Sequence, residues 1–187
     1  MALIYNEADI KRCKEIEVEL EKETELERNT LDVNDSKKKH FCYIIYDDFG
    51  STYNGYTCYI KRRIRQHNNQ IKGGALFTTR RQRKTNDNNH WKYLLAITSE
   101  DEAFDYKKAL SLEWSIKNPT NRRTRPKRNI CGRILSLPLV FSNNKFSHLS
   151  FNLIVHHPLY FDMIKKTLEP FPNVKVCLID DQTSHNL

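Results

Sequence analysis

The chain of 187 residues lacks any stretch long and apolar enough to cross a membrane. Its longest apolar run, ILSLPLVF at residues 134–141, is short and contains a proline. The opening MALIYNEADIKRC turns acidic at once, which is not typical of a secretory signal. No internal repeat is visible. The length therefore predicts one medium domain, or a small one with appendages.

Paired cysteines are also missing. Five thiols are scattered singly, without a C-x-x-C pair: Cys13, Cys42, Cys58, Cys131 and Cys177. An odd number in this pattern indicates a reducing intracellular compartment, and it argues against a disulfide framework or a zinc ribbon. Each cysteine is typical of a small buried hydrophobe.

Charge is abundant but unevenly distributed. The chain has a net charge of +8, yet residues 1–36 carry eleven acids and five bases. The remaining residues, 37–187, therefore hold a net charge of +14. A part this basic attracts polyanions, and nucleic acid is the most common polyanion inside cells. The acidic stretch is either a solvated tail or a phosphate mimic that folds over the basic surface.

The first structured stretch predicts a hairpin and a helix. Two runs rich in aromatic and β-branched residues, at 41–46 and 52–60, flank the Asp/Gly turn DDFGS and predict an antiparallel hairpin. Residues 59–67, YIKRRIRQH, have helical propensity. Three residues share one face of that helix: Ile60, Ile64 and His67.

The next elements complete a small α+β domain. Residues 68–90 contain a Gly-Gly pair and an Asn/Asp cluster, and they predict a mobile basic loop. Residues 91–97 predict a strand. Ser99 and Glu102 form a capping-box pattern that predicts the start of a helix ending at Asn118. We expect a small three-stranded antiparallel sheet flanked by helices.

Three segments follow from these patterns. Residues 1–36 are predicted to be an acidic N-terminal appendage, and residues 37–125 the small α+β domain with the three-stranded sheet. Residues 126–187 are predicted to be a C-terminal α/β extension or a small subdomain. This last segment should contain two or three short strands and one helix at about 158–168.

Five side chains are candidates for phosphodiester chemistry: Tyr43, Tyr53, Arg63, His67 and Glu113. Each alone has an ordinary structural explanation, such as packing, a basic face or a helix cap. Glu113 is unusual because Leu112 and Trp114 flank it, and a carboxylate in apolar surroundings needs a cation. An arginine salt bridge would be the ordinary partner.

Together these groups match the needs of phosphodiester hydrolysis. The reaction needs a group that orients or deprotonates water, a cation for the developing charge, and help for the leaving oxygen. A tyrosine or histidine, an arginine, and a divalent ion on a carboxylate supply these functions. We expect the small sheet to bring all five side chains to one face.

Several motifs in one order resemble the GIY-YIG nuclease superfamily: FCYIIY, YNGYT, RRIRQH and LEW. More narrowly, TYNGYTCYIKRRIRQHN, KGGALFT, HWKYLLAI and SLEWSIKNP resemble the catalytic subunit of the eukaryotic Slx-type structure-specific endonuclease. That enzyme cleaves branched DNA, such as flaps and Holliday junctions. The resemblance covers roughly residues 41–125.

The resemblance implies roles for the five candidates. Tyr43 and Tyr53 would be the site tyrosines, and Arg63 would stabilise phosphate charge. His67 would accept a proton, and Glu113 would ligate Mg²⁺ or Mn²⁺. Which tyrosine acts on the water stays open, and so does the question whether His67 takes its proton.

Three departures accompany the resemblance. The first triad has FCY in place of Gly-Ile-Tyr, and the second has YNG in place of Tyr-Ile-Gly, although both tyrosines and Gly55 are kept. Gly55 would let the backbone turn close to the site. The RING finger of the Slx-type subunit has no counterpart in the zinc-ligand spacing of residues 120–187. A scaffold protein or a homodimer therefore stays open as a partner.

Basic residues outside the site are predicted to contact the DNA backbone rather than to read sequence. They are Lys61, Arg62, Arg65, Lys72, Arg80, Arg81, Arg83, Lys84, Arg122, Arg123, Arg125, Lys127 and Arg128. The run RRTRPKR at residues 122–128 is equally typical of a nuclear-import signal.

We therefore expect a metal-dependent, structure-specific DNA endonuclease that hydrolyses phosphodiester bonds in branched DNA during repair, recombination or replication. It would act in the nucleus or at a site of DNA replication, and not at a membrane. The alternative is a non-catalytic DNA-structure-binding protein on a degenerate nuclease scaffold. A sequence-specific restriction or homing nuclease would need a recognition domain, which residues 130–187 do not obviously supply.

Overall fold

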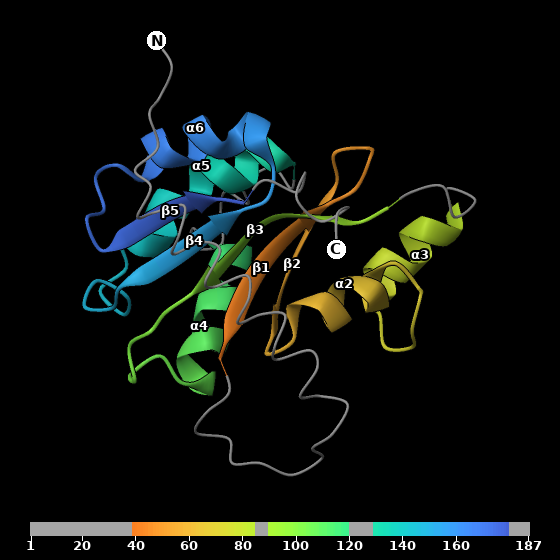
Figure 1. The fold of residues 1–187 in the computed structure, drawn as a ribbon, viewed down its shortest axis with the longest axis horizontal. Coiled ribbons are helices and arrows are strands. Elements are labelled where there is room, and N and C mark those ends of the chain that lie inside the picture. The colour runs from red at the N-terminus through yellow and green to blue at the C-terminus, as the bar shows by residue number, and fades with distance from the viewer. Residues whose placement is uncertain (1–38, 85–89, 120–128, 180–187) are drawn as a thin grey trace.

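The computed structural model describes residues 39–84, 90–119 and 129–179, drawn in colour in Figure 1. Their elements are β1 (Phe41–Tyr46), β2 (Thr52–Thr57), α2 (Ile60–His67), α3 (Leu76–Lys84), β3 (Lys92–Thr98), α4 (Tyr106–Lys117), α5 (Ile130–Phe141), β4 (Phe151–Val155), α6 (Pro158–Leu168) and β5 (Val174–Leu178). The predicted acidic appendage lies outside the described residues. Among these elements, no helix has the length and apolar character needed to cross a bilayer.

One sheet runs through all the described strands in the order β2-β1-β3-β4-β5. The pairs β1–β2, β1–β3 and β3–β4 are antiparallel, as predicted for the first three strands. The pair β4–β5 is parallel, and α6 supplies the crossover that a parallel pair needs. The α+β class is therefore confirmed, and the C-terminal strands extend the predicted sheet to five strands.

The two faces of the sheet are covered by different helices (Figure 1). Side chains of β1 alternate between the faces, as strand geometry requires. Cys42 and Ile44 pack into a large cluster with α4, α5 and α6. Phe41, Tyr43 and Ile45 pack into a smaller cluster that receives α2. Both faces are apolar, which explains the continuous apolar composition of residues 41–46.

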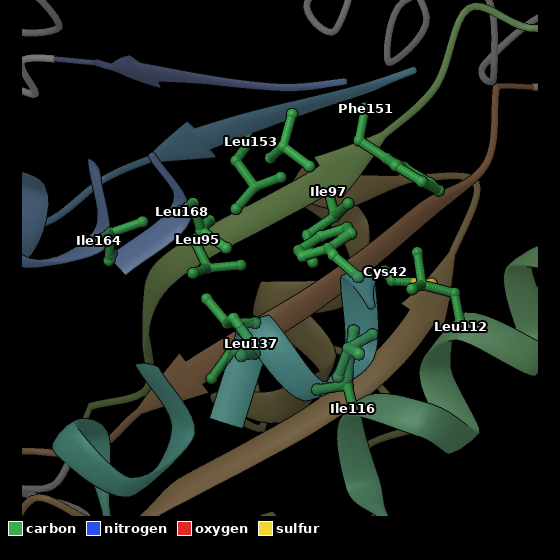
Figure 2. Packing of buried hydrophobic residues seen from close by; sticks show 14 of the residues in the cluster. Cys42, Leu95, Ile97, Leu112, Ile116, Leu137, Phe151, Leu153, Ile164 and Leu168 are labelled. Carbon is green, nitrogen blue, oxygen red and sulfur yellow. The ribbon is translucent and has the colours of Figure 1, made fainter. Parts of the chain in front are cut away.

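The larger cluster holds the C-terminal segment and the predicted nuclease-like segment in one core. Figure 2 shows Leu95 and Ile97 on β3, with Ile116 of α4 and Leu137 of α5 on the side chains' side of the sheet. All four belong to the same buried cluster. Leu153 of β4 joins them from the next strand. Burial of side chains from both segments in one cluster makes the extension part of the scaffold that positions the site.

The C-terminal segment contains the two strands β4 and β5 but a second helix, α5, beside the single helix that was predicted at about 158–168. The apolar run at 134–141 forms the larger part of α5, whose buried apolar residues recur at three- and four-residue intervals: Ile130, Ile134, Leu137, Val140 and Phe141. Asn129 begins the helix by accepting a hydrogen bond from the backbone of Gly132. Pro138 lies inside the helix, in its last turns.

Two further boundaries also differ from prediction. The predicted loop at 68–90 contains the helix α3, which tertiary contacts hold in place. The predicted capping box at Ser99 does not start α4. Asp105 caps that helix by accepting from the backbone of Lys108, because β3 continues to Thr98 and a turn intervenes. The predicted end at Asn118 is confirmed as the C-cap.

Truncation of Phe151 should lower the stability of the whole described fold. Its ring is buried at the start of β4 and packs against the rings of Phe104, Phe141 and Phe146. We expect Phe151→Ala to cost about 3–5 kcal/mol in urea unfolding, because a cavity forms in the larger cluster. Leu159→Ala, at a side chain that is 83% exposed, is the matched control and should change stability by less than about 0.5 kcal/mol. If urea unfolding splits into two steps, and Phe151→Ala leaves the stability of the step that unfolds β1–β3 unchanged, the idea of one shared core would be contradicted.

Candidate active site

The candidate site begins with Tyr43 on β1, which lies directly opposite Gly55 on the edge strand β2. The tyrosine ring passes over this glycine. A Cβ atom at position 55 would stand 2.4 Å from the Tyr43 hydroxyl oxygen, closer than real Cβ contacts allow. The glycine of the second triad is therefore needed here for space.

Helix α2 brings a guanidinium and an imidazole to the Tyr43 hydroxyl. Arg63 Nε donates to Tyr43 Oη at 2.9 Å, and His67 Nε2 lies 2.8 Å from the same oxygen. The i,i+4 spacing places both side chains on the same helix face. Tyr93 of β3 holds the start of α2 by donating to Ile60 O at 2.8 Å. The predicted meeting of Tyr43, Arg63 and His67 is thus seen in the structure.

The second ring nitrogen of His67 is oriented by α3. His67 Nδ1 lies 2.9 Å from Thr78 Oγ1, and Thr78 donates its own hydroxyl proton to Ala75 O at 2.9 Å. The Thr78 oxygen must therefore accept, so Nδ1 carries the imidazole proton. In the neutral ring Nε2 is then bare and accepts the Tyr43 proton. Sequence reasoning missed Thr78, because its segment was predicted as a loop.

Burial keeps this pair uncharged in the resting protein. Burial, together with the positive charge of Arg63, lowers the pKa of His67 to about 3. Burial also raises the pKa of Tyr43 above its ordinary value; the charge and hydrogen bond of Arg63 oppose that rise, and the charges of Tyr53 and Glu113 add to it. The resting site therefore holds a phenol that donates to a neutral imidazole.

Tyr53 packs against the same smaller cluster as Tyr43, but its contacts are made by its ring rather than by its hydroxyl. Its ring centroid is 5.1 Å from that of His67 and 6.2 Å from that of Phe77, with the Tyr53 and Phe77 planes 17° apart. The ring of Tyr53 therefore packs between the imidazole and α3. Of the two predicted site tyrosines, Tyr43 is the one whose hydroxyl bonds both Arg63 and His67.

Glu113 reaches the site from the other face of the sheet, so the expectation of a single face is wrong. It lies on α4, which packs against the face that carries Cys42 and Ile44. Asn54, the neighbour of Ile44 on the edge strand, donates to Glu113 Oε1 at 3.3 Å and to Glu113 O at 3.0 Å. Both halves of the candidate site therefore border the edge strand β2, which carries Asn54 on one face and Gly55 under Tyr43 on the other.

Asn54 and Arg133 are candidate positioning residues that sequence reasoning missed. Asn54 replaces the isoleucine of the Tyr-Ile-Gly triad, and this departure was the available signal. Arg133 is buried on α5, where it donates to Ile116 O at 2.9 Å and to Thr52 Oγ1 at 3.2 Å. A charged residue within an apolar helix run was the signal for Arg133.

The charge of the Glu113 carboxyl depends on these neighbours. Burial raises the pKa of Glu113, and the positive charges of Lys117 and Arg133 lower it in part. Glu113 is only partly buried, so its carboxylate remains accessible to a cation. The C-terminal extension therefore contributes to the electrostatics of the candidate site through Arg133.

The donor set can be tested for a divalent metal. In the described residues there is no group of three or more His, Cys, Asp or Glu side chains placed to hold an ion. Mg²⁺ is commonly held by one or two carboxylates and completes its shell with waters and substrate phosphate oxygens. A single oxygen ligand on Glu113, beside a surface that would receive phosphate, fits this kind of site.

The predicted DNA-contacting residues fall into four groups. Those exposed on α2, α3 and the segment between them are Lys61, Arg62, Arg65, Lys72, Arg80 and Lys84. Arg81 forms an ion pair with the buried Asp47, which fastens α3 to the turn between β1 and β2. Arg83 lies in α3. The rest lie outside the described residues: Arg122, Arg123, Arg125, Lys127 and Arg128.

Comparison with protein families now gives this geometry a context. Residues 39–128 match the sequence model of the GIY-YIG catalytic domain. The chain contains a GIY-YIG catalytic domain. A search of curated proteins finds no match to the sequence. The GIY-YIG domain indicates a nuclease-type enzyme that binds DNA, and nucleases with this domain generally depend on a divalent metal.

The lowered pKa of His67 predicts an acid-sensitive fold. The folded GIY-YIG domain keeps His67 neutral, whereas the unfolded chain takes up a proton below about pH 6.5. Stability should therefore fall as the pH decreases from about 6.5 toward 3. In urea unfolding, we expect the parent to lose about 1–2 kcal/mol more than His67→Gln between pH 7 and pH 5. Equal losses in both proteins would contradict the assignment of a buried neutral imidazole.

Replacement of Asn54 by the isoleucine of the family triad should loosen the Glu113 carboxylate. Partners that orient a metal ligand typically contribute about 10- to 100-fold to metal affinity. We expect Asn54→Ile to weaken Mn²⁺ binding, measured by calorimetry on the free protein, by about 10-fold. Glu102→Gln, at an exposed carboxylate before α4, is the control for a general loss of negative charge. Unchanged Mn²⁺ affinity in Asn54→Ile would exclude a positioning role for Asn54.

Proposed function

We propose that this chain is a metal-dependent, structure-specific DNA endonuclease that hydrolyses phosphodiester bonds in branched DNA, such as flaps and Holliday junctions. The observation that carries the proposal is the Tyr43 hydroxyl, which Arg63 and His67 share inside a GIY-YIG domain. The branched substrate rests on the resemblance to the Slx-type catalytic subunit. The process served would be DNA repair, recombination or replication.

Tyr43, rather than Tyr53, is the tyrosine that we assign to the attacking water. A phenol oxygen has one proton and two acceptor positions. Tyr43 gives its proton to His67 and accepts from Arg63, which leaves one acceptor position for a proton of water. The water would thus be oriented through its own hydrogen bond to Tyr43, before any proton moves.

Proton transfer then follows the hydrogen bonds already in place. As water attacks phosphorus, its proton passes to Tyr43 while the Tyr43 proton passes to His67 Nε2. Moving both protons together avoids a phenolate at Tyr43, which burial disfavours. The positive charge that His67 then gains is balanced by the negative charge that develops on the attacked phosphoryl group. Thr78 keeps the accepting nitrogen bare by holding the imidazole proton on Nδ1. Enzymatic proton transfer of this kind typically contributes 10²- to 10⁴-fold in rate.

Arg63 and Glu113 serve the charge on phosphate. The Arg63 guanidinium lies beside the Tyr43 oxygen, so it stabilises negative charge that develops on the attacked phosphoryl group. Glu113, oriented by Asn54, would hold Mg²⁺ or Mn²⁺. When bound, that ion supplies Lewis-acid stabilisation of the leaving oxygen.

Partners and location complete the proposal. The exposed bases on α2 and α3 would contact the DNA backbone, with a salt-dependent affinity typical of phosphate contacts. A scaffold protein or a second copy of the chain would join at a surface outside the site. The nucleus or a site of DNA replication is the proposed place of action.

Substitution at Glu113 and at Arg63 should separate cleavage from binding. We expect Glu113→Gln and Arg63→Ala each to lower single-turnover cleavage of a 5′-flap by about 10²- to 10³-fold, because each removes one charge-stabilising group. Binding measured in EDTA should change only a few-fold, since many other bases contact the backbone. Glu102→Gln, at an exposed carboxylate before α4, is the matched control for Glu113→Gln and should cut at the parental rate.

The same assay should compare a 5′-flap, a Holliday junction and plain duplex with Mg²⁺, Mn²⁺ or EDTA. Metal-dependent cutting of the branched substrates is the expected result. Parental cutting by both site variants would refute the site assignment. Tight binding without cutting under any metal would instead indicate a DNA-structure-binding protein on a nuclease scaffold.

A further inference from the structure

Two large apolar side chains stand exposed next to the candidate site. Leu76 and Phe77 occupy the first turn of α3, with exposed fractions of 72% and 45%. One side of the Phe77 ring packs against Tyr53, and its ring centroid lies 6.1 Å from that of the buried Trp91. Phe77 therefore continues an aromatic stack that begins at His67 and Tyr53 and ends in solvent.

The turn that carries these side chains is fixed by the site itself. Thr78 follows Phe77, is fully buried and bonds His67 Nδ1. Just before the turn, the Gly73 carbonyl accepts from Arg63 Nη1 at 3.1 Å. Phe77 is thus tied to the same two side chains that hold the Tyr43 hydroxyl. An aromatic ring positioned in this way is preorganised to contact whatever enters the site.

The charges around this turn select the kind of ligand. Helix α3, LFTTRRQRK, contains no acidic residue, and Arg80 and Lys84 are exposed on it. An exposed aromatic ring followed by cations complements a nucleic-acid strand, which offers a flat base next to each phosphate. The partner of a protein interface would instead have to cover these cations with acidic groups.

We propose that Phe77, extended by Leu76, is a stacking subsite for one unstacked nucleobase next to the scissile phosphate. This inference rests on the proposed function, and it deepens it by naming the feature of the substrate that is recognised. In continuous duplex each base is covered by its neighbours, so its face cannot contact Phe77. At a flap or a junction, a base can leave the stack and lie on the ring. The subsite would therefore favour branched DNA without reading sequence.

Fluorescence of 2-aminopurine tests the subsite without any cleavage. The probe is a 5′-flap with 2-aminopurine at the branch, and its partner is a continuous duplex with 2-aminopurine at the same sequence position, both in EDTA. We expect the parent to change the fluorescence of the flap and not that of the duplex. Phe77→Leu keeps an apolar contact with Tyr53 but has no flat ring. It should abolish the change and weaken flap binding by about 5- to 100-fold.

Two variants serve as controls. Phe77→Trp should keep flap affinity and the fluorescence change, because it restores an aromatic face. Leu159→Ala, at an exposed apolar residue of α6, should leave both unchanged. Near-ultraviolet circular dichroism and urea unfolding identify any variant that fails to fold. If Phe77→Leu does not fold, Phe77→Trp still tests whether an aromatic face at position 77 supports flap binding.

Three outcomes would overturn the subsite. In the first, Phe77→Leu weakens flap and duplex binding equally. In the second, it leaves flap binding unchanged. In the third, it alters only the self-association of the protein, measured by sedimentation. The last outcome would assign the patch to a second copy of the chain. Binding and cleavage are measured separately, so a chain that binds through Phe77 but never cuts would refute the endonuclease and leave the subsite standing.

Discussion

The hydroxyl of Tyr43 is the contact on which the candidate site depends. It joins β1 to α2 through Arg63 and His67, and it exists only because the edge strand carries no side chain at Gly55. His67 passes the constraint to Thr78, so the start of α3 is set by the same hydrogen-bonded chain. The bonds from His67 to Tyr43 and to Thr78 are buried, where an unpaired polar group would cost about 1–3 kcal/mol. The chain of bonds is therefore formed together, and it fixes the relative positions of the sheet and two helices.

Local patterns predicted the parts of the fold that local physics determines. Residues 41–57 contain two β-rich runs around an Asp/Gly turn, and they form the predicted hairpin. Its second strand ends at Thr57, three residues before the predicted end. The spacing of Arg63 and His67 correctly placed both on one helix face. By contrast, α3 has a basic, weakly helical sequence, and it is held by the bonds from Thr78 to His67 and from Arg81 to Asp47. Those partners are distant in sequence, so a single-chain pattern could not reveal the helix.

The expectation that all five candidate side chains lie on one face of the sheet was wrong, because the sequence does not show how the helices pack on the sheet. The continuous apolar run at 41–46 does not reveal which helix covers which face of β1. The structure assigns α2 to the face of Tyr43 and α4 to the face of Ile44. Glu113 still borders the same edge strand as Tyr43, because it bonds Asn54 of β2 on one face while Tyr43 lies over Gly55 of β2 on the other. The substitution of asparagine in the second triad becomes understandable in this arrangement, since Asn54 faces α4 and gives Glu113 a hydrogen-bond donor that isoleucine lacks.

The C-terminal extension adds an electrostatic element to a domain whose motifs all precede it. Arg133 lies beyond the matched residues 39–128, yet it is buried between β2 and the end of α4 and lowers the pKa of Glu113. A buried arginine that lost its carbonyl and hydroxyl partners would be an uncompensated charge, which is far more costly than a lost surface contact. The position of α5 and the ionisation of Glu113 are therefore linked: packing of the extension keeps a cation next to the carboxylate, and the carboxylate faces the edge where phosphate would enter. In this chain the scaffold of the nuclease-like site extends through the β4–α6–β5 unit, because that unit holds α5, and α5 holds Arg133.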